Sequence, residues 1–247
     1  MEEHKTTVRS VERALDILLC FTAGTDLAMS EIAERVGLHK STVHRMLATL
    51  EEKGFIARDS ASDRYRLGMR IWELSTHLSN YDDPAILLLP EMERLRDQLD
   101  ETVSLYVRDG EDRLRIQAVQ SGQAIRRVAP VGARMPLYVG ASSKVLLAFA
   151  AEAEREAVMA AKSWPASVSR KQFMEQLEEI RRLGYATSVE ERESGAAAVA
   201  APIFHRSGRL AAALSVSGPA SRLTLEKMRE YIPVMMNSAR LMGTMVK

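Results

Sequence analysis

The sequence predicts an α+β fold with two domains: an N-terminal winged helix-turn-helix, and a C-terminal domain in which helices flank an antiparallel sheet. Two observations lead to this prediction. Residues 8–68 carry amphipathic helical patterns around a glycine-containing turn, followed by a hairpin pattern. From residue 83 onward, strand patterns are interspersed with helical ones, as in domains that pack helices on an antiparallel sheet. The length of 247 residues accommodates two domains.

The first expected helix spans residues 8–21 and is amphipathic. Its apolar side chains recur at helical spacing and form one stripe, made of Val11, Ala14, Leu15, Leu18 and Leu19. We expect this stripe to pack on the next two helices and to complete a three-helix core.

Residues 30–53 (SEIAERVGLHKSTVHRMLATLEEK) predict two helices joined by a short turn. Ser30 is expected to cap the first helix, because its hydroxyl can accept a hydrogen bond from a free backbone N–H. Gly37 should end that helix in the left-handed conformation, and the second helix should begin near Lys40. Such a pair is a helix-turn-helix, whose second helix enters the major groove of DNA with its N-terminal residues first.

The outward face of the second helix presents hydrogen-bond donors and small side chains, with no acidic residue from Leu38 through Leu50. The residues expected to contact bases or nearby phosphates are Lys40, Ser41, Thr42, His44 and Arg45. Arg45 is the candidate for guanine, because a guanidinium can donate to O6 and N7 together. A helical hairpin with a merely solvated face is the alternative, since residues 1–80 hold 11 basic and 12 acidic residues and are not basic overall.

A hairpin pattern follows the second helix. Residues 55–58 and 64–67 predict short strands around the turn-rich residues 59–63. A hairpin in this position is a wing, and three of its arginines could reach the phosphate backbone: Arg58, Arg64 and Arg66. The predicted DNA-binding domain therefore spans residues 8–68, and residues 69–82 predict a linker helix. Pro84 then fits the first turn of a new helix.

The second domain, residues 83–247, is expected to mix helices and strands. Helices are predicted at 84–100, 142–150, 151–161, 169–183 and 223–246, and strands at 102–107, 113–119, 198–204 and 210–217. Within 113–119 apolar residues alternate with Arg113 and Arg115, so we expect the arginine side to face water. Within 210–217, Ser215 and Ser217 share a face with small residues, which leaves either room for a polar ligand or a surface for packed helices.

Composition excludes several functions. Cys20 is the only cysteine, so an intrachain disulfide and a thiolate cluster are excluded. Apolar runs fall short of the roughly 18 residues of a membrane span, and no signal-type core follows the N-terminus, so we expect a cytoplasmic protein without a membrane partner. Residue 141 is alanine where a Ser-x-x-Lys pair needs serine, and the five histidines lack metal-binding spacing. We expect no enzymatic activity, no catalytic residue, no metal and no cofactor, and a solvated loop around Glu190, Glu191 and Glu193.

Several segments resemble the IclR family of bacterial transcriptional regulators. They are SVERALDILLCF, MSEIAERVGLHKSTVHRMLATLEEKGFIARD and RYRLGMRIWEL in the first part, and APVGARMPLY, SSKVLLA, GYATSVEE and GAAAVAAPIFHRSGRLAAALSVSGP in the second. The resemblance spans nearly the whole chain and stays in register. It implies a GAF-like effector-binding domain, double-stranded operator DNA and a small-molecule effector as partners, and a homodimer or a dimer of dimers.

The resemblance also implies which positions form the effector pocket: Arg127, Met135, Ala141, Ser142, Ser188, Ala198, Ser215 and Ser217. Arg127 stands where some members have an apolar residue, and Ser188 where some have an acidic one. We therefore expect an anionic organic or aromatic acid as the effector, because a guanidinium matches a carboxylate. Two alternatives stay open: Arg127 faces solvent or a subunit interface, or the chain is a ligand-binding sensor module that does not read DNA.

Overall fold

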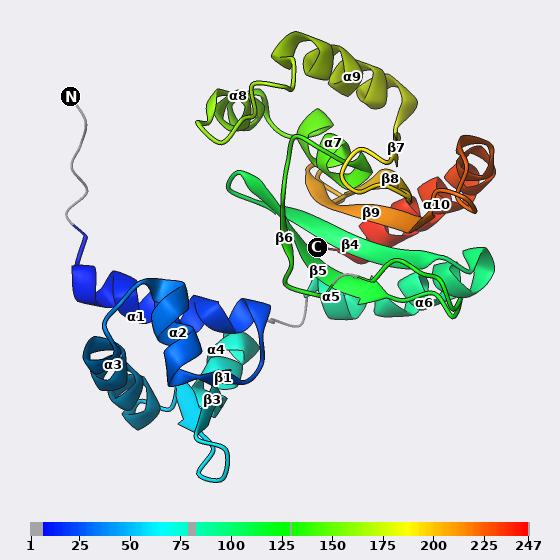
Figure 1. Ribbon diagram of the computed structural model, residues 1–247. Helices are drawn as coiled ribbons and strands as arrows, with labels where there is room; N and C mark the ends of the chain where they lie inside the picture. The colour runs from blue at the N-terminus through cyan, green and yellow to red at the C-terminus, as the bar shows by residue number, and fades with distance from the viewer. Residues whose placement is uncertain (1–6, 79–82, 129, 247) are drawn as a thin grey trace. The chain divides into compact units, whose positions relative to one another are not determined.

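The computed structural model describes residues 7–78, 83–128 and 130–246 (Figure 1). The chain divides into two compact units, Met1–Tyr81 and Asp82–Lys247. Each unit has its own hydrophobic core, and the α+β fold with an N-terminal winged helix-turn-helix is confirmed. Within the described residues, no helix is both long enough and apolar enough to cross a membrane.

The N-terminal unit is three helices and a small sheet, with a further helix at its end. Its elements are α1 (Arg9–Leu19), the 3-10 turn η1 (Cys20–Ala23), β1 (Leu27–Ala28), α2 (Met29–Val36), α3 (Lys40–Glu52), β2 (Ile56–Arg58), β3 (Arg64–Leu67) and α4 (Met69–Leu78). The sheet has the antiparallel order β1-β3-β2, and β2 and β3 form the wing. The linker helix predicted at 69–82 is observed as α4 up to Leu78, and its last four residues lie outside the described part.

The capping of α2 differs from the prediction. The helix begins at Met29, so Ser30 lies inside its first turn and is not the N-cap. Instead, the Glu31 carboxylate accepts a hydrogen bond from the Ala28 backbone N–H at 2.6 Å. A carboxylate in the first helical turn can reach back to the residue that precedes the helix, which satisfies the same free donor. At the other end, Gly37 adopts φ 62°, and the predicted left-handed cap is confirmed.

The predicted orientation of α1 is only partly right: Leu18 packs against the core and Ala14 is half-buried, but the rest of the predicted stripe is exposed. Ile17 and Phe21 are the side chains that enter the core, whereas Val11 and Leu15 are each 53% exposed and Leu19 is 61% exposed. Residues 17 and 21 lie four apart on one helical face, and the stripe chosen from the sequence is centred on another. Three apolar side chains of α1 are therefore left largely uncovered within its own unit.

The C-terminal unit is a six-stranded antiparallel sheet between two layers of helices. Its elements are α5 (Pro84–Leu87), α6 (Leu89–Leu99), β4 (Thr102–Asp109), β5 (Asp112–Val119), β6 (Arg134–Pro136), α7 (Ala141–Ala148), α8 (Glu152–Ala160), α9 (Arg170–Leu183), β7 (Ala186–Val189), β8 (Ala196–Phe204), β9 (Leu210–Pro219) and α10 (Leu225–Met245). The strand order is β6-β5-β4-β9-β8-β7. The single helix predicted at 84–100 is observed as two, α5 and α6.

Two separate cores lie on the two faces of this sheet. On one face, α6 and α10 bury Met92, Leu95 and Met235 against Leu105 and Val216. On the other face, side chains of α7, α8 and α9 pack over the strands through an aromatic group that includes Trp164 and Phe173. Figure 1 shows the sheet between these layers. Because both faces are covered, neither side of the central strands is wet.

Candidate nucleic-acid interface and effector cavity

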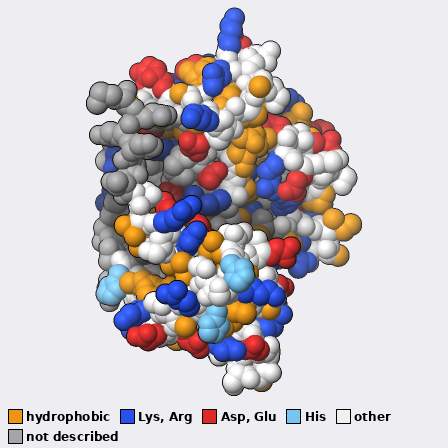
Figure 2. All heavy atoms as spheres, turned by 60° about the vertical axis from the view of Figure 1, so that its left-hand side comes forward, with side chains coloured by type: hydrophobic (Ala, Val, Ile, Leu, Met, Phe, Trp, Pro, Cys, Tyr) orange, Lys and Arg blue, Asp and Glu red, His pale blue; other side chains and the backbone are white. Residues whose placement is uncertain are grey.

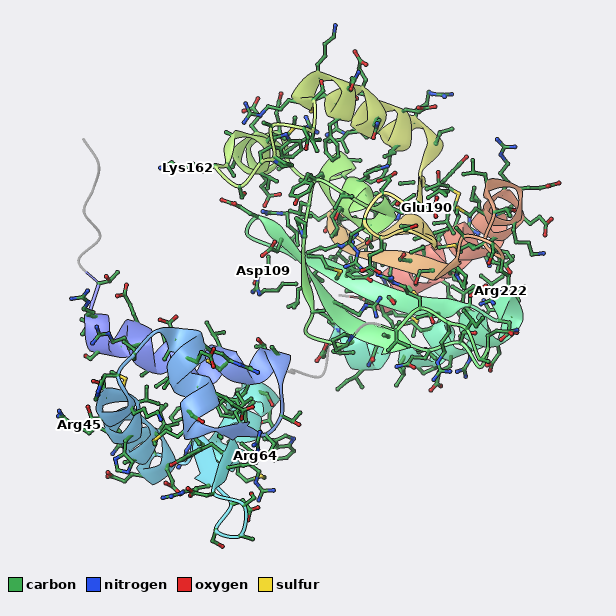
Figure 3. All side chains as sticks on the ribbon, viewed as in Figure 1. Arg45, Arg64, Asp109, Lys162, Glu190 and Arg222 are labelled. Atoms are coloured by element: carbon green, nitrogen blue, oxygen red, sulfur yellow. The ribbon has the colours of Figure 1, made fainter. Side chains whose placement is uncertain are left out.

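The predicted DNA-reading face lies on α3. Val43 and Leu47 are fully buried and fix the helix on the domain core. Four of the five predicted contact residues point outward and are exposed, and Thr42 is half-buried. In Figure 3, Arg45 projects from α3 away from the body of its unit. No ion pair engages the side chains of Lys40 or Arg45 among the described residues, so both charges are available to a ligand.

The first turn of α3 is organised by its own capping residue. His39 is the N-cap, and its Nδ1 lies 2.8 Å from Ser41 Oγ and 3.4 Å from the Ser41 backbone N. The first turn holds no acidic side chain. The free N–H groups and the helix dipole therefore favour an anion, such as a DNA phosphate, at this end of the helix.

The three wing arginines lie in different surroundings. Arg58 pairs with Asp63 and stacks over the Tyr65 ring, 5.7 Å from its centroid. Arg64 turns into the unit, where its Nε lies 3.2 Å from Asp26 Oδ2 and its Nη2 2.8 Å from Glu31 Oε2. This contact fastens β3 to the start of α2, so Arg64 does not point outward as predicted. Arg66 is exposed, and its side chain forms no hydrogen bond or ion pair within the described residues.

Figure 2 shows Lys, Arg and His side chains interspersed with apolar and uncharged ones on the N-terminal unit. The basic and acidic residues of this part of the chain are nearly equal in number, 11 against 12 in residues 1–80. The recognition surface is thus defined by which groups stand on α3 and the wing rather than by a broad basic patch.

A cavity in the C-terminal unit collects the predicted effector positions. Its volume is about 60 Å³, and the empty space in and around it, which includes open solvent at its mouth, is about 490 Å³. All eight predicted positions line it: Arg127, Met135, Ala141, Ser142, Ser188, Ala198, Ser215 and Ser217. They come from β6, the first turn of α7, β7, β8, β9 and the segment before β6. The cavity therefore lies on the α7 side of the sheet, where the last strand presents its small side chains.

Among the lining residues that the sequence did not predict are two arginines of β5. Arg113 and Arg115, which were expected to face water, are only 5% and 2% exposed. Arg113 Nη1 donates to Ser142 Oγ at 2.7 Å, and Arg115 Nη2 donates to the Tyr106 hydroxyl at 2.7 Å. The prediction fails because the helices of the α7 layer cover this side of β5. One signal in the sequence could have identified them: it predicts enough helices to cover both faces of the sheet, so neither side of β5 need face water.

The surroundings of Arg113 are unusual for a charged group. Its guanidinium carbon lies 5.2 Å from the centre of the Tyr106 ring, and Gly140 passes so close that a Cβ there would be 3.0 Å from Nη1. Burial lowers the pKa of Arg113, and the positive charges of Arg115 and Arg127 act in the same direction, while Tyr106 and the Glu191 carboxylate oppose the shift. Its Nε and the buried Ser217 hydroxyl have no hydrogen-bond partner among the described residues. The cavity thus contains donors that are not satisfied by the protein.

The sequence predicts a solvated loop around Glu190, Glu191 and Glu193. The structure instead shows ion pairs between this loop, which joins β7 to β8, and the rest of the unit. Glu191 pairs with Lys144 Nζ and accepts from the Gly140 backbone N–H at 3.1 Å. Glu193 pairs with Arg127 at the edge of the cavity. The loop is therefore attached to the first turn of α7 and to the cavity by ion pairs.

The serine and lysine at the start of α7 have structural partners. Ser143 Oγ donates to the Pro136 carbonyl at 2.9 Å, and Lys144 is paired with Glu191. Neither is placed as a nucleophile with an adjacent base. Among the described residues, no group of three or more His, Cys, Asp or Glu side chains could hold a metal ion.

Comparisons with known proteins agree with this arrangement. Residues 10–60 match the IclR helix-turn-helix domain, and residues 83–243 match the C-terminal domain of bacterial IclR transcriptional regulators. The chain is 31% identical over 225 residues to the HTH-type transcriptional regulator KipR of Bacillus subtilis (strain 168), covering 89% of this chain and 90% of that protein.

Solved structures give the same result. An IclR transcriptional regulator from Alicyclobacillus acidocaldarius superposes with a TM-score of 0.79 at 27% identity, covering 96% of this chain and 98% of that one. An IclR homologue from Microbacterium hydrocarbonoxydans, crystallised in complex with 4-hydroxybenzoate, superposes with a TM-score of 0.77 at 28% identity, covering 94% and 99%.

Proposed function

The chain belongs to the IclR family of DNA-binding transcriptional regulators, and from this premise we propose that a small organic acid in its C-terminal cavity controls its binding to operator DNA. The observation that carries the proposal is the cavity itself: the Nε of the buried Arg113 guanidinium and the Ser217 hydroxyl have no hydrogen-bond partner, and no carboxylate forms an ion pair with that guanidinium, among the described residues. Buried charges are ordinarily paired, so an anion is the natural occupant.

The DNA side of the proposal assigns base contacts to α3. Four residues near the start of the helix contact bases or adjacent phosphates: Lys40, Ser41, Thr42 and His44. Arg45 pairs with guanine through its two parallel donors. On the wing, Arg58 and Arg66 hold the phosphate backbone. Arg64 acts indirectly by fixing the wing to α2.

The protein acts as a dimer in this proposal, because two half-sites must be read together. Apolar side chains that the N-terminal unit leaves uncovered support a second copy: Val8, Val11, Leu15 and Leu19 on or beside α1, and Met69 and Trp72 on α4. Trp72 is 63% exposed, an unusual state for so large an apolar surface. Association of two copies would cover these side chains, and a dimer of dimers would present four recognition helices.

The acid effector is supported by the chemistry of the cavity and by a relative. The homologue from Microbacterium hydrocarbonoxydans holds 4-hydroxybenzoate, an acid with a hydroxyl group. In this chain guanidiniums and serine hydroxyls line the cavity, and they would orient a carboxylate and a second polar group. The effector changes DNA affinity by binding one arrangement of the assembly better than another, since a ligand can shift an equilibrium only by its differential affinity.

A fluorescence anisotropy titration tests the DNA side. The probe is labelled DNA from the region flanking the protein's own gene, measured at fixed salt with unlabelled competitor DNA. Arg45→Ala should weaken specific binding by about 1–3 kcal/mol, roughly 5- to 150-fold. Arg182→Ala, which removes an exposed arginine from α9, is the matched control and should bind like the wild type. Equal affinities for Arg45→Ala and the control would contradict the assigned role of α3.

A further inference from the structure

The charges that line the cavity are strongly unequal. Four guanidiniums reach it, from Arg113, Arg115, Arg127 and Arg192, and the only carboxylate among the described residues that line it is that of Glu193. Two of these arginines are almost fully buried. Bringing like charges together away from water is costly unless an opposite charge joins them. A ligand with a single negative charge could pair with only one of Arg113 and Arg127, which line the same cavity.

The inner end of the cavity is built for one acid group. Arg113 donates to Ser142 Oγ at 2.7 Å, but its Nη2 faces only the Met135 sulfur, at 3.7 Å. Its Nε is unpartnered among the described residues, as is the hydroxyl of Ser217, which is 8% exposed. Sulfur is a weak acceptor, so these donors have more capacity than the described residues use. A carboxylate at this end would pair with the Arg113 guanidinium and supply an acceptor that the described residues lack.

The outer end already holds a carboxylate, and it belongs to the protein. Glu193 pairs with Arg127, whose side chain is 19% exposed, and with Arg192 at 2.7 Å. Glu193 itself is 48% exposed and stands on the loop between β7 and β8. Only the Glu193 partner of this pair is half-exposed, so its carboxylate can move into water when another acid group takes its place on the largely buried Arg127. The Glu193 carboxylate can therefore be replaced at Arg127 by another one at small cost.

We propose that the effector is a small diacid, one acid group of which pairs with Arg113 at the inner end while the other takes the place of the Glu193 carboxylate on Arg127. This inference rests on the proposed function, since it specifies the acid that the same cavity binds. Glu193 is then an internal competitor that occupies the outer position in the effector-free protein. Its displacement releases one of the ion pairs that hold the β7–β8 loop to the cavity, which gives the effector a local structural consequence.

Isothermal titration calorimetry on the full-length protein tests the proposal with probes matched in size. Succinate is compared with butyrate, glutarate with pentanoate, and terephthalate with 4-methylbenzoate. Within at least one pair, the diacid should bind ten-fold or more tightly than the monoacid. Arg113→Lys should weaken diacid binding at least ten-fold, and its melting temperature shows whether it is folded.

The role of Glu193 is tested by two substitutions on the same loop. Glu193→Gln removes the competing charge and should tighten diacid binding by several-fold while leaving monoacid binding nearly unchanged. Glu190→Gln makes the same charge change on the same loop. The Glu190 carboxylate accepts from the Gly195 backbone N–H and does not pair with Arg127, so diacid affinity should stay at the wild-type value. Figure 3 labels Glu190 on this loop.

The outcomes distinguish failure of the diacid inference from failure of the organic-acid effector in the proposed function. If monoacids bind as tightly as their diacid partners, or if both loop variants behave alike, the diacid inference is overturned and an organic-acid effector stands. If the folded protein binds none of the acids, both the inference and the acid effector of the proposed function are overturned.

Discussion

The two units use arginine in opposite ways. In the N-terminal unit, Arg45 and Arg66 stand exposed with no ion pair among the described residues, whereas in the C-terminal unit Arg113 and Arg115 are buried beneath the helices that cover the sheet. An exposed arginine costs nothing to keep and suits a large polyanion whose charge is screened by salt. A buried arginine is costly to keep and suits a small anion that enters a preformed cavity.

The strongest consequence of this comparison concerns salt. Raising the salt concentration from 50 to 200 mM should weaken operator binding by on the order of 10³-fold for about six phosphate contacts, because bound DNA releases counterions. Acid binding in the cavity should change by no more than about two-fold over the same range, since buried charges are screened little. Anisotropy and calorimetry at matched salt measure the two slopes. Equal slopes would show that the two sites do not differ in this way.

A second test compares two arginines of the C-terminal unit. Arg222 holds the buried Glu101 carboxylate through bonds of 2.5 and 3.0 Å, and Figure 3 labels it. Arg222→Met leaves that carboxylate unpaired and should lower the free energy of unfolding by on the order of 3 kcal/mol. Arg113→Met removes a buried charge that no carboxylate contacts among the described residues, so stability should be unchanged or higher while acid binding is lost. Chemical denaturation measures both, and a large loss of stability in Arg113→Met would contradict the account.

A third test distinguishes the two neighbouring arginines of the wing. Arg66→Ala should leave the melting temperature unchanged and should reduce the slope of log affinity against log salt by about 1, because the variant neutralises one phosphate fewer. Arg64→Ala breaks the ion pairs to Asp26 and Glu31, so it should lower stability by about 1 kcal/mol. Thermal melting and salt titrations are read together. A melting temperature that falls only in Arg66→Ala would reverse the assignment.

The smallest expected effect is a pH dependence in the N-terminal unit. The hydrogen bond from the Ala28 N–H lowers the pKa of Glu31, and the charge of Arg64 lowers it further. A carboxyl group with a lowered folded-state pKa stabilises the fold above its usual pKa, and this contribution is lost as the pH falls through the folded-state value. Glu31→Gln should therefore melt below the wild type at pH 7, and the difference should shrink as the pH falls below the usual carboxyl range and through the lowered pKa. A difference that persists unchanged at low pH would exclude the carboxylate as its cause.

Local patterns were sufficient to predict the helix-turn-helix. Gly37 marks the end of α2, and the apolar spacing of Val43 and Leu47 defines the buried face of α3. The burial of Ile17 instead of the Leu15 stripe was not predicted, because α1 is apolar on two sides and only tertiary packing selects between them. The edge strands β6 and β7 were also missed, since strands of three or four residues carry little periodic signal.

The candidate cavity could be predicted only in part, because the burial of its charged residues depends on tertiary packing. Its small residues, such as Ser215 and Ser217, follow from strand alternation, and the remaining predicted positions came from the family resemblance. Arg113 was assigned to water because a strand with alternating Arg and Leu usually has one wet face. Whether that face is covered depends on helices that follow it in the chain, so burial of a charged side chain is a property of the whole fold rather than of its strand.

The central claim is that the cavity and the recognition helix are coupled. It is tested most directly by measuring operator affinity by anisotropy with and without a saturating acid identified by calorimetry, in the wild type and in Arg113→Met. The account predicts that the acid changes operator affinity by about 5- to 150-fold in the wild type and has no effect on the variant. An acid that binds the wild type but leaves operator affinity unchanged would contradict it.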